Sequence, residues 1–450
     1  MNKDVTQPSL DNHYCIKEGI LPGLSNPQDI TIYGDTITAI VDSTADTLDQ
    51  DVTIIDARGC RVFPGLIDLY SRCREPGLTR KGNIVSESIA AFSAGFTHVL
   101  CSPDTIPAVD SVATVELITH RSEQATAGAS VIPMAALTVG LKGEQLSELA
   151  TLQAAGCPVA SQADQPIDST TVLYSAMEYA SSFKMPLLIN ARDAQLGIDG
   201  CAHTGATATQ LGLPTIPVAA ETVALARLIE LCRETGCRLH ISRISSARAV
   251  EHINDAKQEG LPISCDVGIH HLFYIDEFLA GYDTSFHSAV PFRGREDRQA
   301  LREGLKSGVI DAICTDHAPH DIDASLAPFP VTEPGLSAYD WFIPLLLQVP
   351  DATGLSLEQV IDKLHDEPLK ILGKKPAPPF AVGSPASLFV LNTDAHFEKN
   401  PSAIYSAGAN NPLAIHDAQM LGLSPLKGNV KVVFHQGKKT SYSNAPVMPA

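Results

Sequence analysis

Residues 64–77 read PGLIDLYSRCREPG, a short apolar run followed by a polar segment. The apolar half, GLIDLY (65–70), is the first of eight such runs, which alternate with longer amphipathic segments up to about residue 375. This alternation is typical of repeated βα units around a parallel sheet. Eight runs predict a closed (β/α)8 barrel. The other seven are HVLCS (98–102), VIPMAAL (131–137), PVAS (158–161), PLLIN (186–190), RLHIS (238–242), PISCDV (262–267) and DAICTD (311–316).

Two of the segments between the runs carry clear helical signals. The segments 84–96 (IVSESIAAFSAGF) and 219–236 (AAETVALARLIELCRETG) both end close to a glycine. In the second segment the apolar residues recur at helical spacing, and Gly236 can adopt the left-handed cap. We expect these helices in the outer ring of the barrel.

Strand patterns also occur at both ends of the chain. The segment QDITIYGDTITAIV (28–41) alternates apolar and polar residues around Gly34-Asp35, as a β-hairpin does. Strand-like patterns recur in three further segments, so we expect a small β-sandwich built from residues 1–63 and 376–450. The barrel is then expected at 64–375, with a linker, KKPAPP, at 374–379. The three segments are VTIIDARGCRVF (52–63), ASLFVLNT (386–393) and NVKVVFHQGKKT (429–440).

Composition limits the possible partners and location. The 450 residues include 44% hydrophobic and 18% charged residues, as in a globular protein, and the formal net charge of −19 argues against a nucleic-acid partner. We find no signal-peptide core and no apolar stretch long enough to span a bilayer. Ten cysteines without CxxC pairs fit reduced thiols, so a cytoplasmic location is expected. Cys232 and Cys237 are expected to pack on a helix.

Functional residues of such a barrel lie at the carboxyl ends of its strands. There, PGLIDLYSRCREPG resembles the first-strand signature of dihydroorotases, in which PGLID is followed by an HxH metal pair and REPG. Tyr70 and Arg72 occupy the positions of that pair. At the eighth strand, ICTDHAPH (313–320) matches the same family's pattern and retains Asp316, His317 and His320. The resemblance implies an amidohydrolase barrel.

The remaining metal-ligand positions also depart from the family pattern. The bridging acidic residue of the fourth strand corresponds to Gln162 in the segment SQAD, although a shifted alignment places Asp164 there. The ligand histidines of the fifth and sixth strands are replaced by Asn190 and Arg243. His240, three residues before Arg243, is expected to face away from it.

Of the ligand set that the resemblance implies, only Asp316 survives clearly. One carboxylate cannot hold a binuclear site, and arginine has no lone pair to donate to a metal. We therefore expect Arg72 and Arg243 to replace the charge of the metals and to pair with Asp316. No metal, no other cofactor and no catalytic residue are expected.

The substrate-binding positions are altered as well. Arg74 corresponds to the family's carboxylate-binding arginine, and can equally be retained for packing or for a structural ion pair. The family's MPNT-like segment reads Ser102-Pro103-Asp104-Thr105 here. A carboxylate at Asp104 would repel the carboxylate of dihydroorotate.

The sequence leaves two other sites open. His270, His271 and His287 could form a new metal site, but clustered histidines in loops more often cap helices or face water. Asp316 and His317 could form a metal-free acid/base pair, although no nucleophile or oxyanion stabiliser accompanies them.

Over nearly its whole length the chain is similar to non-catalytic, dihydroorotase-like subunits of bacterial aspartate carbamoyltransferase. That resemblance implies a pseudoenzyme that holds catalytic carbamoyltransferase subunits in a large hetero-oligomer for pyrimidine biosynthesis. The alternatives are an active dihydroorotase or related cyclic-amide hydrolase with one metal or none, and a non-catalytic sensor of dihydroorotate or carbamoyl-aspartate.

Overall fold

Eight parallel strands form the ring of the barrel in the computed structural model, which describes residues 13–43, 52–398 and 404–441. Each strand overlaps one of the apolar runs seen in the sequence, because a strand enclosed by helices is buried on both faces. The strands are β6 (Leu66–Ser71), β7 (Phe96–Cys101), β8 (Ser130–Pro133) with its continuation β9 (Ala135–Ala136), β10 (Ala160–Ser161), β11 (Leu187–Ile189), β14 (Leu239–Ile241), β15 (Ile263–Gly268) and β16 (Ala312–Cys314).

The ring closes between its first and last strands. Ser71 pairs in parallel with His317, and the Arg72 amide donates to the His317 carbonyl at 2.8 Å. An apolar cluster that includes Leu69 of β6, Leu100 of β7 and Leu188 of β11 fills the interior, and Ile371 and Leu372 at the end of α12 pack against it. The predicted fold class is therefore confirmed.

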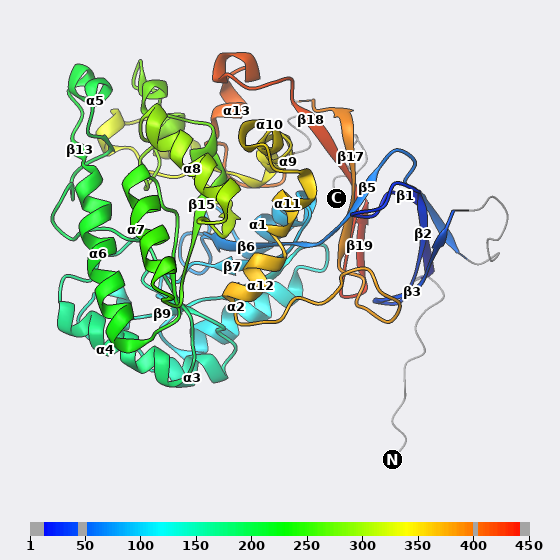
Figure 1. Ribbon diagram of the computed structural model, residues 1–450, viewed down its shortest axis with the longest axis horizontal. Helices are drawn as coiled ribbons and strands as arrows, with labels where there is room; N and C mark the ends of the chain where they lie inside the picture. The colour runs from blue at the N-terminus through cyan, green and yellow to red at the C-terminus, as the bar shows by residue number, and fades with distance from the viewer. Residues whose placement is uncertain (1–12, 44–51, 399–403, 442–450) are drawn as a thin grey trace.

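Helices surround this ring (Figure 1). The first and longest follow the sequence signals: α1 begins with a capping box at Asn83, and α6 ends at Gly236 with φ +62°. The helices are α1 (Ile84–Ser93), α2 (Val112–Gln124), α3 (Leu149–Ala154), α4 (Thr170–Ser182), α5 (Ala206–Leu211), α6 (Val218–Thr235), α7 (Ala247–Gln258), α8 (Arg295–Ser307), α9 (Phe342–Leu346), α10 (Val349–Thr353), α11 (Leu357–Asp362), α12 (Asp366–Ile371) and α13 (Pro412–Ile415).

Cys232 and Cys237 are both buried, but only Cys232 is helical, so the expectation for Cys237 was wrong. Gly236 ends α6 in the left-handed conformation before the second cysteine is reached. The Cys232 thiol lies 3.3 Å from the Cys237 carbonyl oxygen. No helix in the described part of the chain is long and apolar enough to cross a membrane.

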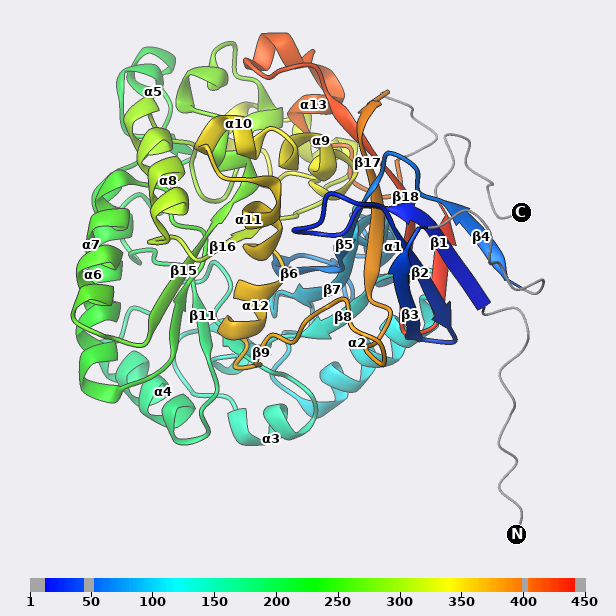
Figure 2. The same ribbon diagram turned by 45° about the vertical axis from the view of Figure 1, so that its right-hand side comes forward.

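The sandwich lies beside the barrel and joins strands from both chain ends (Figure 2). One sheet has the order β3-β2-β1-β4 and the other β19-β18-β17-β5, where β5 pairs antiparallel with β17. The strands are β1 (His13–Gly19), β2 (Gln28–Tyr33), β3 (Thr36–Asp42), β4 (Thr53–Asp56), β5 (Arg61–Pro64), β17 (Leu388–His396), β18 (Lys427–His435) and β19 (Lys438–Ser441). The proposed sandwich segments also contain residues 1–12, 44–51, 399–403 and 442–450, which lie outside the described residues.

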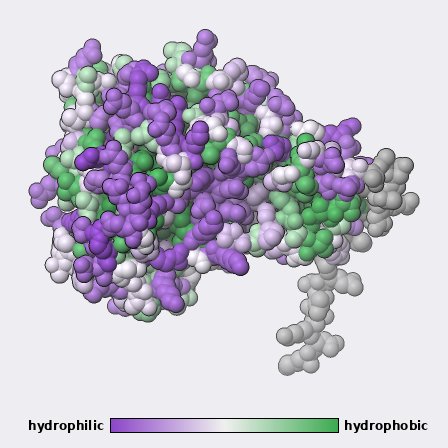
Figure 3. Space-filling model, in the orientation of Figure 1, coloured by the Kyte–Doolittle hydropathy of each residue, from purple (hydrophilic) through white to green (hydrophobic). Residues whose placement is uncertain are grey.

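Short elements complete the loops at the carboxyl ends of the strands. On the face seen in Figure 3, hydrophilic side chains cover most of the barrel, as expected of a chain with a net charge of −19. The short elements are β12 (Ala202–His203), β13 (Thr215–Ile216) and the 3₁₀ segments η2 (Val139–Leu141), η3 (Ile269–Leu272), η4 (Asp276–Leu279), η5 (Thr284–Phe286), η6 (Ile322–Ser325), η7 (Phe329–Val331), η8 (Tyr339–Trp341) and η10 (Ala418–Leu421).

Candidate functional site

A cluster of charged side chains lies where the carboxyl ends of the barrel strands meet. We call it the mouth cluster, and it consists of Tyr70, Arg72, Asp104, Asp164, Arg243 and Asp316. Tyr70 and Arg72 lie at the end of β6, and the other four follow β7, β10, β14 and β16, so the closed ring brings them together. The cluster therefore occupies the place where the resemblance to dihydroorotases implies a metal centre.

Arg243 is the most deeply buried cation of the mouth cluster, with 1% of its surface exposed. Its two terminal nitrogens form ion pairs with Asp316, at 2.8 Å, and with Asp164. Its guanidinium carbon lies 3.7 Å from the centre of the Tyr70 ring, a cation–π contact. Its backbone has φ +58°, and its amide donates to Asp266 at 2.5 Å, which fixes the turn after β14.

Arg72 pairs with two carboxylates, but Asp316 is not one of them. Its Nε donates to Asp104 at 2.7 Å, and its Nη2 donates to Asp164 and to the Tyr70 hydroxyl. The expectation that both arginines pair with Asp316 was therefore wrong for Arg72. Asp164 lies between the two guanidinium groups and accepts hydrogen bonds from both. Asp316 forms its ion pair with Arg243.

The charges of the mouth cluster compensate one another. Burial alone would raise the pKa of Asp164, but the two guanidinium groups hold it well below its usual range. Burial would also raise the pKa of Asp104, and Arg72 lowers it. Burial raises the pKa of Asp316 despite its contact with Arg243. Three carboxylates face two guanidinium groups, and Asp316 is the least compensated of the three.

The residues of the mouth cluster do not fit a divalent cation. Arginine offers only donors, so Arg72 and Arg243 repel a cation at the two places that they fill. Their carboxylate partners already accept hydrogen bonds from guanidinium groups. In the described parts of the chain, no three His, Cys, Asp or Glu side chains come together in an arrangement that could hold a metal ion.

The fourth-strand position is filled by Asp164 instead of Gln162. The Gln162 amide donates to the Leu141 carbonyl at 2.9 Å and accepts from the Thr138 hydroxyl at 3.0 Å, outside the mouth cluster. Ala163 between them has φ +52°, so the chain turns there and brings Asp164, the third residue after the strand, into the mouth cluster. The sequence allowed Asp164 as the alternative to Gln162, but it did not predict the turn at Ala163 that selects Asp164.

Asn190 and Arg243 line a small cavity beside the mouth cluster, with a volume of about 30 Å³. The Asn190 amide donates to the Ser242 carbonyl at 3.1 Å, so this side chain bridges β11 and β14. Pockets for organic ligands usually measure several hundred Å³. A cavity of this size accommodates about one water molecule, and no cyclic amide fits.

Asp316 and His317 do not form an acid/base pair. The His317 Nε2 lies 2.8 Å from Glu87, and its Nδ1 accepts from the Ala338 amide at 2.9 Å. Both ring nitrogens are therefore engaged on the side of α1 and η8, away from the mouth cluster. Asp316 has φ +49°, which separates the directions of the two neighbouring side chains. Sequence reasoning did not identify Glu87 as the partner.

Arg74 lies next to the mouth cluster without an acidic partner. Its Nε donates to the Pro319 carbonyl and its Nη2 contacts the His320 ring, both at 2.9 Å. No carboxylate in the described residues lies within ion-pair distance of it. Burial, together with the charge of Arg72, lowers the Arg74 pKa to about 10. These contacts hold the loop after β16 against the loop after β6.

His270, His271 and His287 are buried, and the expectation that such residues cap helices or face water was wrong for them. His270 and His271 lie on the short segment η3, not on a strand. His271 contacts the Val290 carbonyl at 3.0 Å and His287 contacts the Thr332 hydroxyl at 2.7 Å. Burial lowers their pKa values to about 3, 4 and 4 in order. They are not gathered into a metal site.

His240 faces the barrel interior, away from the Arg243 guanidinium, as expected. Its ring lies between Ser264, 2.9 Å from Nδ1, and Asp266, 3.0 Å from Nε2. Asp266 in turn accepts the Arg243 amide, so His240 supports the mouth cluster only through the backbone.

Comparison with known proteins agrees with this architecture. A family model described as dihydro-orotase-like matches residues 59–249. The chain is 41% identical over 362 residues to a dihydroorotase-like protein of Pseudomonas aeruginosa, covering 80% of this chain and 85% of the relative. It is 37% identical over 362 residues to a dihydroorotase of Syntrophotalea carbinolica, covering 80% and 85%.

The fold also matches a solved structure, L-hydantoinase (dihydropyrimidinase) from Arthrobacter aurescens. The TM-score is 0.78 at 21% sequence identity, over 97% of each chain. This likeness shows the barrel-plus-sandwich fold. The chain belongs to the dihydroorotase-like family.

Proposed function

We propose that this protein is a catalytically inactive dihydroorotase homologue that serves as a structural subunit of aspartate carbamoyltransferase in de novo pyrimidine biosynthesis. The proposal rests on one observation above all. Two guanidinium groups, from Arg72 and Arg243, lie where the resemblance implies metal ligands, and they share the carboxylate of Asp164.

The chemistry of the mouth cluster explains why inactivity follows. Hydrolysis of a cyclic amide in this family requires a metal that lowers the pKa of water and polarises the carbonyl. A guanidinium group cannot take a proton from water at neutral pH, because it is already protonated. The carboxylates that would act as bases are bound to the two arginines, and the cavity beside them measures only about 30 Å³.

A structural role requires the fold to persist without the metal. Ion pairs between well-fixed, buried partners maintain the geometry of strand ends even where they add little net stability. The mouth cluster joins the ends of β6, β14 and β16 in this way. The names of the Pseudomonas relatives, dihydroorotase-like protein, agree with a chain that keeps the fold and departs at the ligand positions.

A second candidate function is dihydroorotase activity itself. The relatives named dihydroorotase, at 37% identity in Syntrophotalea carbinolica, favour it. For the protein to be an active dihydroorotase, the side chains of Arg72 and Arg243 would have to move out of the mouth cluster and let water in. The cost of separating buried ion pairs, several kcal/mol for each, argues against such a state.

The test is co-expression of this chain with the aspartate carbamoyltransferase of the same genome. We expect one large complex by light scattering, no dihydroorotate turnover, and loss of carbamoyltransferase activity when this chain is left out. The Syntrophotalea relative, assayed in parallel, is the positive control for turnover. Two separate proteins, each fully active alone, would contradict the subunit role.

The same fractions separate the remaining possibilities. Turnover by the isolated chain would identify an active hydrolase. A rise in melting temperature with dihydroorotate or carbamoyl-aspartate, absent in Arg74→Met, would identify a sensor, since a ligand bound only to the folded state stabilises it.

A further inference from the structure

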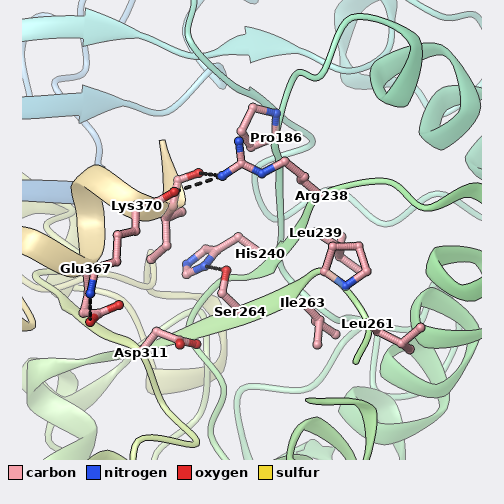
Figure 4. Close-up of a pocket in the computed structure, with 12 residues that line it drawn as sticks. Pro186, Arg238, Leu239, His240, Leu261, Ile263, Ser264, Asp311, Glu367 and Lys370 are labelled. Carbon is pink, nitrogen blue, oxygen red and sulfur yellow. Dashed lines mark hydrogen bonds and ion pairs between the residues drawn. The ribbon is translucent and has the colours of Figure 1, made fainter. Parts of the chain in front are cut away.

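A second polar cavity lies at the opposite end of the barrel, and we call it the floor cavity. It measures about 240 Å³ and opens where β11, β14 and β15 begin, against α12 (Figure 4). Its polar lining consists of Arg238, His240, Ser264, Asp311, Glu367 and Lys370. Nothing in the proposed function uses this cavity.

The base of the floor cavity presents a hydrogen-bond acceptor. An ionised Asp266 can only accept, so the His240 Nε2 carries the proton of the 3.0 Å contact between them. The His240 Nδ1 is then an acceptor and takes the hydroxyl proton of Ser264 at 2.9 Å. The Ser264 oxygen keeps its free lone pairs for the cavity that it lines. A ligand that meets Ser264 must therefore donate.

The wall of the floor cavity presents a cation without an acidic partner. Arg238 donates from Nη2 to the carbonyls of Lys370 and Ile371 at the end of α12, at 2.9 and 3.3 Å. Among the described residues no carboxylate lies within ion-pair distance of Arg238. Its position at the cavity wall suits the carboxylate of a ligand.

The two acidic residues of the lining are already neutralised. Asp311 pairs with Lys257 at 2.6 Å, and Glu367 pairs with Lys370 at 2.8 Å. Asp266 lies behind His240 at the base of the cavity, so Arg238 is the cation of the wall that remains free to pair with a ligand. A buried or half-buried charge of this kind attracts an anionic group.

We propose that the floor cavity binds a small amino-carboxylate, a molecule that carries a carboxylate together with an amide or ammonium group. Its carboxylate pairs with Arg238, and its N–H donates to the Ser264 oxygen. The volume suits a ligand smaller than those of typical organic pockets. A plain anion fits less well, because accepting from Ser264 would take that hydroxyl away from its contact with the His240 Nδ1.

The test is isothermal titration calorimetry of the whole protein with L-asparagine as the probe. We expect saturable binding without proton uptake, seen as a heat independent of the buffer's ionisation enthalpy. Acetate and methylammonium, which each offer one of the two groups, should bind at least about tenfold more weakly. Ser264→Ala and Arg238→Met should each weaken asparagine binding about tenfold or more.

Arg233→Gln is the matched control, because Arg233 pairs with Glu230 and Glu259 outside the floor cavity. It should bind asparagine as the unaltered chain does. Circular dichroism identifies a variant that has lost its fold, and Ser264→Ala, which removes one oxygen, keeps the test valid if Arg238→Met unfolds. No saturable heat up to about 10 mM, equal binding by Ser264→Ala, or tighter binding of acetate with proton uptake would overturn the proposal.

Discussion

The two ends of the barrel use arginine in opposite ways. At the mouth, Arg72 and Arg243 are buried and paired with carboxylates, and the adjoining cavity measures about 30 Å³. At the floor, Arg238 borders a cavity of about 240 Å³ and contacts only backbone carbonyls. The end where barrels of this type usually carry their sites is filled by the chain's own charges. Buried arginines can thus fill the mouth of a barrel with ion pairs while the opposite end keeps an open cavity.

The backbone at the mouth helps to keep this arrangement. Four residues near the strand ends, Arg74, Ala163, Arg243 and Asp316, have positive φ without being glycine. Each such residue costs on the order of 1–3 kcal/mol and persists only where its surroundings hold it. The ion pairs of the mouth cluster supply that support.

The largest effect is expected from Asp164→Ala. This change leaves two buried guanidinium groups facing each other without the carboxylate that they share, and should lower the free energy of unfolding by about 3–5 kcal/mol. Urea denaturation measures it. Asp323→Asn, at an exposed position, is the control and should change stability by less than about 0.5 kcal/mol. A loss below about 1 kcal/mol for Asp164→Ala would mean that the arginines find other partners.

Acid should open the mouth before the floor. Burial lowers the pKa values of His270, His271, His287 and His320 to between about 3 and 4. The unfolded chain binds these protons near pH 6.5, so stability falls as pH drops below that value, by about 1 kcal/mol per histidine at pH 5.5.

Hydrogen exchange measured between pH 7 and 5 checks the order of opening. Amides of the loops after β15 and β16 should lose protection first, while those of α12 stay protected. If the amides at both ends lost protection at the same pH, the barrel would open in one cooperative transition. The mouth would then not be less stable to acid than the floor.

Arg243→Lys should have an intermediate effect. Lysine keeps the charge but cannot pair with Asp164 and Asp316 through a planar fork, and it loses the stacking on Tyr70. We expect a loss of about 2 kcal/mol, measured by thermal denaturation. The corresponding change at the floor, Arg238→Lys, should lose less than half as much, because Arg238 has no ion pair to break.

The smallest effect at the mouth is expected from Arg74→Met. Arg74 contacts a carbonyl and a neutral ring, and its loss leaves no carboxylate unpaired. Methionine keeps most of the packing, so the free energy of unfolding should fall by about 1 kcal/mol or less. A loss as large as that of Asp164→Ala would place Arg74 inside the ion-pair network.

The fold was predictable from the sequence because buried parallel strands leave continuous apolar runs such as GLIDLY and DAICTD. Strand β1, HYCIKEG, was missed because its exposed and buried residues do not alternate. In the site, the positions of Arg72 and Arg243 at strand ends were predictable, and the resemblance implied that ligand histidines stand there in dihydroorotases.

The pairing within the site was not predictable. Which carboxylate meets Arg72 depends on left-handed turns at Ala163 and Asp316. Alanine gives no sign of positive φ, and aspartate adopts it at only a few of its positions. The left-handed turn at Asp316 also points the His317 side chain away from Asp316 and toward Glu87. Glu87 lies on α1, far from His317 in the sequence.

The most direct test is a zinc titration of the purified chain, with bound metal measured by mass spectrometry and stability by calorimetry. If the guanidinium groups have replaced the metals, fewer than about 0.1 zinc ions per chain will remain after gel filtration, and neither zinc nor a chelator will move the melting temperature. One or two zinc ions per chain, with a higher melting temperature and hydrolysis of dihydroorotate, would contradict the account.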